Sequence, residues 1–379
     1  MRLIATRFSS SLLAIGMFLS SPALHSEIIF EENFDNQEDW HGGMGNVRTS
    51  SRIPARGAVI PSKWDFARVD PTWAPSKGYP DRHESLEILA SNSDKARGGT
   101  GKSMVGWRDS HDPGWLRWNS ENLLLKRLGN QTEVYVEFYI TFSPETHQSH
   151  LNNMLGTSKI FRLYSFSGNW NDPFDYFGGV SHPNLIWSVK GGTTYGVQNK
   201  ISIYGVGGAA GAPDMPRKAV NSGDYPLSYK TNTTGMAPAG ADPQLTDKLN
   251  GGIIGPDMEG PALMESVFGP PGSWTKVAFY VKMNSEPGMH DGVLSQWIDD
   301  TRILHTERVN WITKTSPGEY WNVLGIGGND FFQTYSNEER HEEWYAIDDL
   351  KVMTKIPDDL NYKPINTSAP NSPMGVTVD

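Results

Sequence analysis

The chain has 379 residues, no cysteine, a formal net charge of −10 and an isoelectric point near 5.5. The absence of cysteine excludes a disulfide framework. The acidic balance, without a basic run interleaved with aromatics, argues against a nucleic-acid partner. The 39 glycines, 25 prolines, 13 tryptophans and 14 tyrosines are typical of a turn-rich β protein with much aromatic surface.

The first 26 residues have the features of an export signal. Arg2 and Arg7 make a basic start, residues 12–19 form an apolar run, and either Ser21-Pro22-Ala23 or Leu24-His25-Ser26 offers small residues for cleavage. The apolar run is too short to span a membrane, and no later segment is long and apolar enough. We therefore expect an exported bacterial protein, periplasmic or extracellular, without a membrane span.

The rest of the chain shows no clear linker and no internal repeat. Strand signals recur along its length, so we expect a single domain over residues 27–356 that functions as a monomer. Residues 42–79 and 207–271 are rich in turn-forming residues and predict long loops, which often line a binding site. Residues 357–379 read as a disordered tail.

The clearest strand signal covers residues 275–283, where apolar and polar side chains alternate. One face would carry Thr275, Val277, Phe279, Val281 and Met283, and the other Lys276, Ala278, Tyr280 and Lys282. This alternation is typical of an antiparallel sheet with one buried and one solvated face.

Similar signals predict an all-β protein. Strands are expected at 27–34, 84–90, 101–107, 133–142, 158–166, 185–190, 200–206, 273–283, 293–298, 302–306, 321–327 and 344–353. Helical turns are expected only at 119–128 and 336–343. So many short strands favour a two-sheet antiparallel sandwich.

Several short motifs in chain order resemble those of a known group of proteins. They include Glu31-x-Asn33-Phe34 near the start, Asp291-Gly292-Val293 followed by Trp297-Ile298-Asp299, and Ile347-Asp348-Asp349-Leu350 near the end. Together they resemble the concanavalin A-like jelly rolls of secreted polysaccharide lyases, of the heparin lyase I, glucuronan lyase and family 14 alginate lyase type. The resemblance implies a jelly-roll fold and cleavage of an acidic, uronate-containing polysaccharide by β-elimination.

Other jelly-roll enzymes fit less well. Glycoside hydrolases of family 16 carry a Glu-x-Asp-x-x-Glu strand, whereas this chain has Glu84-Ser85-Leu86-Glu87-Ile88. Family 7 alginate lyases carry Arg-x-Glu-Leu and Gln-x-His strands, and neither occurs here. A non-catalytic carbohydrate-binding or adhesion protein remains the main alternative to a lyase, because fold does not fix function. A glycoside hydrolase is the third possibility.

A lyase needs a base and cationic or amide groups that neutralise the uronate carboxylate. Arg162 and Tyr164 are the first catalytic candidates. Strand alternation puts them on one face with Ile160, and Lys159 on the other face with Phe161, unless a bulge intervenes. Tyr280 and Lys282, on the polar face of the 275–283 strand, are the second pair.

Further candidates for substrate binding come from neighbouring strands and turns. They are Lys159, Trp187, Lys190, Tyr204, Lys276, His290, Gln296 and Trp297. Each also has an ordinary structural interpretation. A lysine-bearing strand face is often simply solvated, and a strand tryptophan more often fills the core.

A structural calcium ion is the one cofactor that the resemblance implies, and no organic cofactor is expected. In such jelly rolls the ion lies between the first and last strands. Glu31 or Glu32 and Asp348 or Asp349 would then be the matching oxygen donors.

Overall fold

The computed structural model describes most of the chain after the expected export signal. The described residues are 26–41, 60–69, 83–109, 117–151, 155–171, 181–190, 196–202, 224–230, 268–289, 291–299, 301–314, 316, 318–332, 338, 341–358 and 360. The expected signal at 1–26 lies almost entirely outside them, as do most of the 207–271 insertion and of the C-terminal tail. Within this part of the chain, no helix is long and apolar enough to cross a membrane.

The described strands form two antiparallel sheets. The nine-stranded sheet contains β1 (Ile28–Glu32), β2 (Trp40–His41), β4 (Leu86–Ile88), β5 (Met104–Asp109), β7 (Glu133–Phe142), β12 (Thr275–Lys282), β13 (Gly292–Ile298), β14 (Thr301–Val309) and β16 (Glu342–Met353). Its order is β14-β13-β12-β7-β16-β5-β4-β2, with β1 paired to β16. First and last strands therefore pair, as in many sandwiches.

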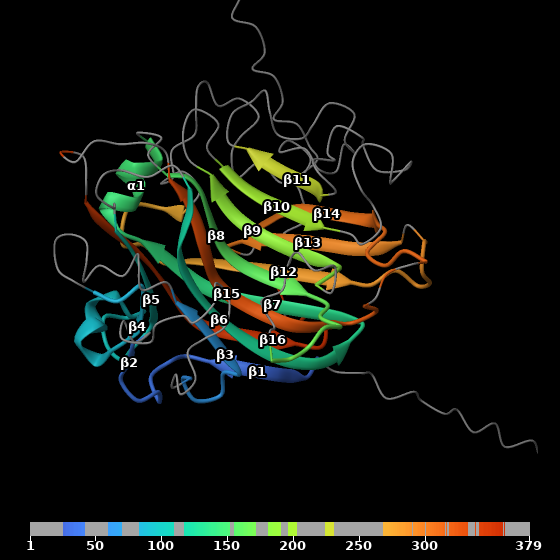
Figure 1. The fold of residues 1–379 in the computed structure, drawn as a ribbon, viewed down its shortest axis with the longest axis horizontal. Helices are drawn as coiled ribbons and strands as arrows, with labels where there is room; N and C mark the ends of the chain where they lie inside the picture. Colours follow the sequence, from blue (N-terminus) through green and yellow to red (C-terminus); the bar gives the residue numbers. More distant parts are fainter. Residues whose placement is uncertain are drawn as a thin grey trace, which may run out of the picture.

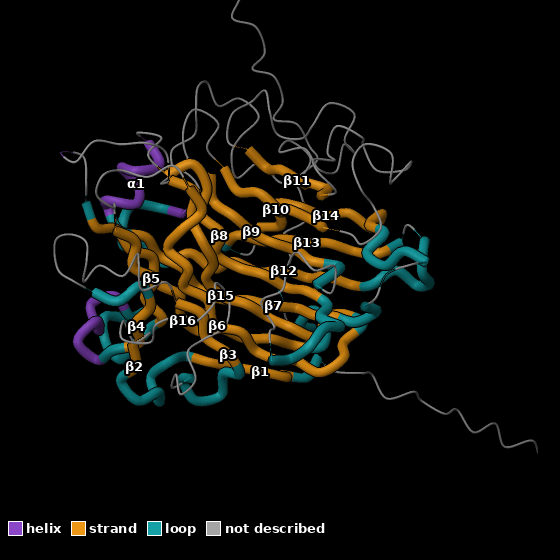
Figure 2. The backbone as a smooth tube through the Cα atoms, viewed as in Figure 1, coloured by secondary structure: helices purple, strands orange, loops and turns teal. Residues whose placement is uncertain are grey.

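The seven-stranded sheet contains β3 (Phe66–Val69), β6 (Arg117–Gln131), β8 (Leu155–Tyr164), β9 (Asn184–Lys190), β10 (Gly196–Ser202), β11 (Asp224–Lys230) and β15 (Trp321–Phe332), in the order β11-β10-β9-β8-β15-β6-β3. A short 3-10 helix (η1, Ala90–Lys95) and one α-helix (α1, Pro144–Leu151) complete the described elements. Figures 1 and 2 show the strands as layered sheets, with α1 at one end of the sandwich.

The core lies between the two sheets. Phe138 of β7 and Phe279 of β12 meet Phe161 of β8, and the Phe161 and Phe279 rings stack with centroids 4.5 Å apart. Burial along β12 follows the predicted alternation, because Val277, Phe279 and Val281 are fully buried while the alternate positions face away from the core. The all-β, two-sheet antiparallel sandwich predicted from the sequence is thus confirmed.

The prediction of helical turns at 119–128 is wrong, because these residues belong to β6. The run Leu123-Leu124-Leu125 masked the strand period. Leu124 packs into the core between the sheets, whereas Leu123 and Leu125 pack in a second cluster on the other face of the seven-stranded sheet. A strand buried on both faces shows no alternation in sequence.

Candidate functional site

The outer face of the seven-stranded sheet, which points away from the nine-stranded sheet, carries two predicted cations, Lys159 and Arg162, and two arginines that were not predicted. Arg68 of β3 pairs in register with Leu123 of β6, and Arg127 follows Leu125 by two residues on the same strand. Lys159 and Arg162 come from β8. We call these four residues the cationic face.

A bulge in β8 decides which side chains reach the cationic face. The register with β9 shifts between Lys159 and Phe161, so that β8 has one extra residue, Ile160. As a result Ile160 and Phe161 are both fully buried in the core. Lys159 therefore lies on the same outer face as Arg162, pairing with Ser188 of β9. The predicted grouping of Arg162 with Ile160, and of Lys159 with Phe161, is wrong for this reason.

Exposure differs among the predicted residues on β8. Lys159 is partly exposed, whereas Arg162 is only 5% exposed. The Tyr164 ring is fully buried among Leu123, Leu125, Phe166 and Val323. Tyr164 therefore shares the predicted face with Arg162 but packs in an apolar cluster, and Lys159 is the most accessible of the three side chains.

Glycines in β15 let the neighbouring side chains close over the middle of this sheet. A Cβ atom at Gly325 would lie 2.8 Å from Leu125 Cδ2, and one at Gly328 would lie 2.6 Å from the Lys159 carbonyl oxygen and 2.8 Å from its Cβ. Gly327 has φ +87° and leaves no room for a side chain. β15 therefore presents bare backbone between the side chains of β6 and those of β8.

Aromatic residues lie at one edge of the cationic face. The Arg127 guanidinium lies 4.1 Å from the centroid of the Trp170 ring. Trp170 in turn stacks with Phe66 at 6.2 Å and meets Phe166 edge-on at 4.8 Å. A cation over a partly exposed indole combines a charged group and a flat apolar surface. Anionic sugar rings are recognised by the same two features.

Tyr280 and Lys282 lie on the opposite side of the molecule. Both are on the outer face of the nine-stranded sheet, because Phe279 and Val281 between them fill the core. The Tyr280 hydroxyl donates a short hydrogen bond to the Glu133 carboxylate. Burial and this carboxylate raise the pKa of Tyr280 well above its usual value. The structure therefore separates the two predicted catalytic pairs, and Tyr280 holds its proton tightly.

The other predicted binding residues fall into three groups. Trp187 is fully buried against Phe138 and Phe279, so it cannot stack on a sugar. Lys276, Gln296 and Trp297 belong to the nine-stranded sheet, with Gln296 and Trp297 buried. Lys190 ends β9, but its side chain lies outside the described part of the chain, as do Tyr204 and His290 entirely.

The two glutamates of the strand that was compared with the hydrolase motif, Glu84 and Glu87, make structural contacts. Glu87 Oε2 accepts hydrogen bonds from Trp107 Nε1 at 2.8 Å and from Asn92 Nδ2 at 2.9 Å. Its Oε1 accepts from the Glu84 backbone N–H at 3.0 Å. Glu87 is buried, so both of its oxygens are committed to the fold. The Glu84 and Glu87 pair does not form an open acid and base across a cleft.

The expected calcium donors are only partly brought together. Asp348 is buried, and its oxygens accept backbone hydrogen bonds from Arg97 at 2.9 Å and Asp349 at 2.8 Å. Burial, and then the nearby Asp349 and Asp35 carboxylates, raise the pKa of Asp348 to about 7.

Neither glutamate of β1 completes this set. Glu31 is exposed and pairs in register with Lys351, and the Glu32 carboxylate accepts from the Phe34 N–H and Gln37 Nε2. Among the described residues, no group of three or more His, Cys, Asp or Glu side chains could hold a metal ion. The pairing of Glu31 with Asp348 does not fit a calcium site, although the accumulated negative charge around Asp348 would suit a hard cation.

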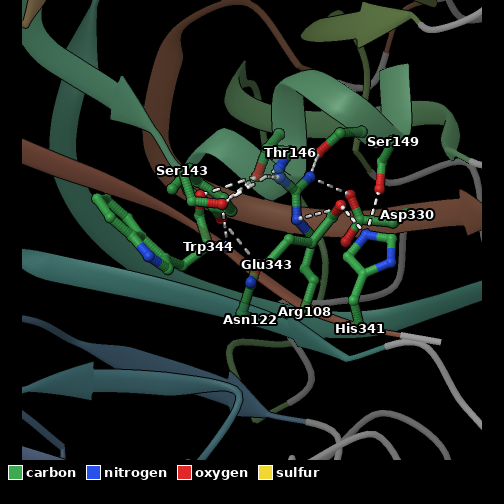
Figure 3. Close-up of polar contacts among 11 residues, drawn as sticks. Arg108, Asn122, Ser143, Thr146, Ser149, Asp330, His341, Glu343 and Trp344 are labelled. Carbon is green, nitrogen blue, oxygen red and sulfur yellow. Dashed lines mark hydrogen bonds and ion pairs between the residues drawn. The ribbon is translucent and has the colours of Figure 1, made fainter. Parts of the chain in front are cut away.

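A buried ionic network near α1 was not predicted from the sequence (Figure 3). Arg108 of β5 is fully buried; its Nη1 lies 2.5 Å from Ser158 Oγ and 3.1 Å from Asp330 Oδ1, and its Nε lies 3.4 Å from Glu343 Oε1. Burial raises the pKa of Asp330 to about 6. These partners come from three strands far apart in sequence, so no local pattern could reveal them.

The protein is therefore an all-β, two-sheet antiparallel sandwich with a basic outer face on its seven-stranded sheet.

No family model matches the sequence, and no curated protein matches it.

Solved structures similar to the chain include several carbohydrate-active enzymes. Alginate lyase Aly36B is 13% identical, with a TM-score of 0.44, over 86% of this chain and 97% of that chain. The PL-14 alginate lyase from Aplysia kurodai is 8% identical, with a TM-score of 0.39, over 71% and 86%. A family GH16 endo-beta-1,3(4)-glucanase, SCLam, is 9% identical, with a TM-score of 0.39, over 86% and 94%. What each of these enzymes cleaves is a property of that protein.

Proposed function

We propose that the protein is an exported polysaccharide lyase that cleaves a uronate-containing polysaccharide by β-elimination on the cationic face. The observation that carries the proposal is the bulge in β8, which brings Lys159 and Arg162 onto one face. A face of this charge attracts a polyanion even though the whole chain is acidic.

The chemistry follows from the position of these two cations. Removal of the proton next to a uronate carboxylate develops negative charge on that carboxylate as the enolate forms. Lys159, which is partly exposed, would contact the carboxylate directly. Arg162, nearly buried, would add its positive charge from beneath, where low dielectric strengthens the interaction. The abstracted proton passes to a general base, the bond between the ring carbon and the leaving sugar oxygen breaks as the double bond forms, and the leaving oxygen takes up a proton from water.

The test is an ultraviolet assay for the unsaturated product over alginate, glucuronan, ulvan and heparinoid substrates. Lys159→Ala is expected to lower kcat/KM by about 100-fold on the substrate that is cleaved, a typical loss for one charge-stabilising group. Lys282→Ala removes an exposed lysine from the opposite outer face and should leave the rate unchanged. Equal losses in both variants would contradict the assignment of the site.

A carbohydrate-binding protein is the second candidate, favoured by the Arg127 and Trp170 pair at the edge of the cationic face. Binding of a polyanionic glycan with no unsaturated product from any substrate would support this candidate and contradict the lyase. Release of fragments without a new chromophore would instead indicate hydrolysis.

A further inference from the structure

Lys159 is held from inside the sandwich by residues that do not reach the cationic face. Its neighbour Ser158 points inward and is fully buried, with Oγ 2.5 Å from Arg108 Nη1. Ser158 also pairs in register with Asp330 of β15, whose carboxylate lies 3.1 Å from the same Arg108 nitrogen. Arg108 belongs to the other sheet, so it ties β8 and β15 to β5 across the core.

The contacts of Arg108 with Ser158 and Asp330 lie where the pairing of β8 and of β15 is irregular. The register of β15 with β8 shifts between Ile326 and Asp330, and the register of β8 with β9 shifts between Lys159 and Phe161. The pair Ser158 and Asp330 marks one end of this irregular stretch. Arg108 therefore fixes the regular pairing just beside the bulge that turns Lys159 outward.

A second set of contacts reaches Lys159 through β15. Asn122 Oδ1 accepts hydrogen bonds from the Gly328 N–H at 3.1 Å and from the Tyr345 hydroxyl at 2.9 Å. The Arg108 guanidinium lies 5.1 Å from the centroid of the Tyr345 ring. Gly328 lies so close to the backbone and Cβ of Lys159 that a methyl group at position 328 would have no room.

The anchoring of Arg108 itself is extensive. Glu343 and Asp330 balance its charge, and its Nη2 lies 3.3 Å from Thr146 Oγ1 of α1. These contacts, several of which are visible in Figure 3, leave a fully buried guanidinium with little freedom to move. A buried guanidinium whose charge and hydrogen bonds are satisfied by several partners is held in one position within the fold.

From these contacts we infer that Arg108 is a positioning residue for Lys159. Through Ser158 and Asp330 on one side, and Tyr345, Asn122 and Gly328 on the other, it sets the bulge geometry that turns Lys159 onto the outer face that Arg162 shares. The inference rests on the proposed function for its effect on catalysis, but not for the placement of Lys159.

The test uses two substitutions that disturb this route without leaving a buried charge unpaired. Ser158→Ala removes the hydroxyl that Arg108 holds, and Gly328→Ala pushes a methyl group against Lys159. Ser103→Ala is the matched control, because Ser103 is an equally buried serine whose hydroxyl donates to the Lys95 carbonyl oxygen and, in the described hydrogen bonds, not to Arg108, its partners or β8. Arg108→Lys is the direct variant where it folds.

The first measurement does not depend on activity. The full-length protein is treated with a limiting amine-reactive reagent, and modification of each lysine is followed by peptide mass spectrometry. Ser158→Ala and Gly328→Ala should each change the rate at Lys159 several-fold while Lys276 and Lys282 stay constant, and Ser103→Ala should leave Lys159 as in the wild type. Unchanged modification of Lys159 in both variants would overturn the inference.

The second measurement applies to the polysaccharide that the wild-type protein cleaves. Displacement of Lys159 should lower kcat by about 10- to 100-fold with little change in KM, because misplacement of a group by an ångström acts mainly on the transition state. Full kcat in both variants would also overturn the inference. A wild-type protein without lyase activity would contradict the proposed function, and the modification rates would still decide the role of Arg108.

Discussion

Placement of a single side chain depends here on one extra residue in a strand. Strict alternation puts Lys159 and Arg162 on opposite faces, and the insertion of Ile160 opposite a regular stretch of β9 puts them on the same face. The sequence allowed for such a bulge but did not locate it, because Ile160 and Phe161 are both apolar and fit either face. The nearby Gly327-Gly328 pair in β15 was the available signal, since paired glycines inside a strand often mark a bulge.

The tyrosine on the other sheet provides a prediction at the same scale. Tyr280→Phe should leave the rate of polysaccharide cleavage within about twofold of the wild type, since surface changes away from a site have small effects. The reason is that the Tyr280 hydroxyl is bonded to Glu133 on the face opposite Lys159, and its raised pKa makes it a poor base. The check is kcat/KM from initial rates, and a loss of an order of magnitude would return Tyr280 to the list of catalytic candidates.

The tryptophans show that residue type alone was not enough to predict which side chains could contact a sugar. Trp187 and Trp297 were candidates for sugar stacking, yet both are buried, while Trp170, which no strand pattern indicated, lies at the edge of the cationic face against Arg127. Strand tryptophans more often fill the core, and a loop tryptophan is free to meet a ligand. Position relative to the sheet, and not the indole itself, separates the two roles.

At the scale of the element, β15 is the strand whose sequence is most tightly constrained. Gly327→Ala should destabilise the protein by about 3 kcal/mol or more, because a Cβ atom there would lie 1.7 Å from the Asn122 carbonyl oxygen in addition to the strain of φ +87°. Gly98→Ala has a similar φ of +86° with nothing within 4 Å, so it should cost only about 1 kcal/mol. Urea unfolding of both variants measures the difference, and equal costs would show that the close approach to β6 is relieved by movement.

The ends of β1 and β16 provide a second prediction at this scale. We propose that the calcium ion implied by the resemblance binds at Asp348 without Glu31, because Glu31 is exposed and lies in register with Lys351. The described residues group no three acidic side chains there for a metal ion. Added calcium should then raise the melting temperature by several degrees and a chelator should reverse it. Asp348→Asn is expected to remove the calcium effect and Glu31→Gln to leave it intact. A melting temperature independent of calcium would rule out the site.

Most strands could be predicted from the sequence, whereas the pairing between strands could not. The alternation at 275–283 gave β12 with the correct face buried, and the strands at 133–142 and 344–353 match β7 and β16 closely. β6 was missed because its run Leu123-Leu124-Leu125 is buried on both faces and shows no alternation. Pairing of strands up to hundreds of residues apart is not encoded in any local period, so the separation of Lys282 from Lys159 onto opposite sides of the sandwich could not be deduced.

For the whole molecule, buried acids make stability depend on pH. Burial raises the pKa of Asp330 to about 6 and, with help from nearby carboxylates, that of Asp348 to about 7. A carboxyl group with a raised pKa in the folded state contributes stability that is fully present below its unfolded pKa, near 4, and is lost as the pH rises through 6 to 7. Glu87 and Glu343 have lowered pKa values, so their contribution is lost instead as the pH falls into the acid range.

The expected result is a stability maximum near pH 5, with the free energy of unfolding lower by about 1 to 3 kcal/mol at pH 8 in the presence of a chelator. Urea titrations across this range provide the measurement. Asp330→Asn should flatten the decline between pH 5 and pH 8, whatever its effect on absolute stability. A free energy that rises steadily from pH 5 to pH 8 would show that the two raised pKa values do not control the balance.

The opposed outer faces of the sandwich also have a practical consequence. A support, dye or fusion partner coupled through an exposed side chain such as Lys282 would occupy the nine-stranded sheet and leave the Arg162 side turned toward the medium. Orientation on a bead or sensor chip can therefore be chosen by selecting one lysine. Immobilisation through Lys282 should preserve capture of an acidic glycan, whereas immobilisation through Lys159 should abolish it.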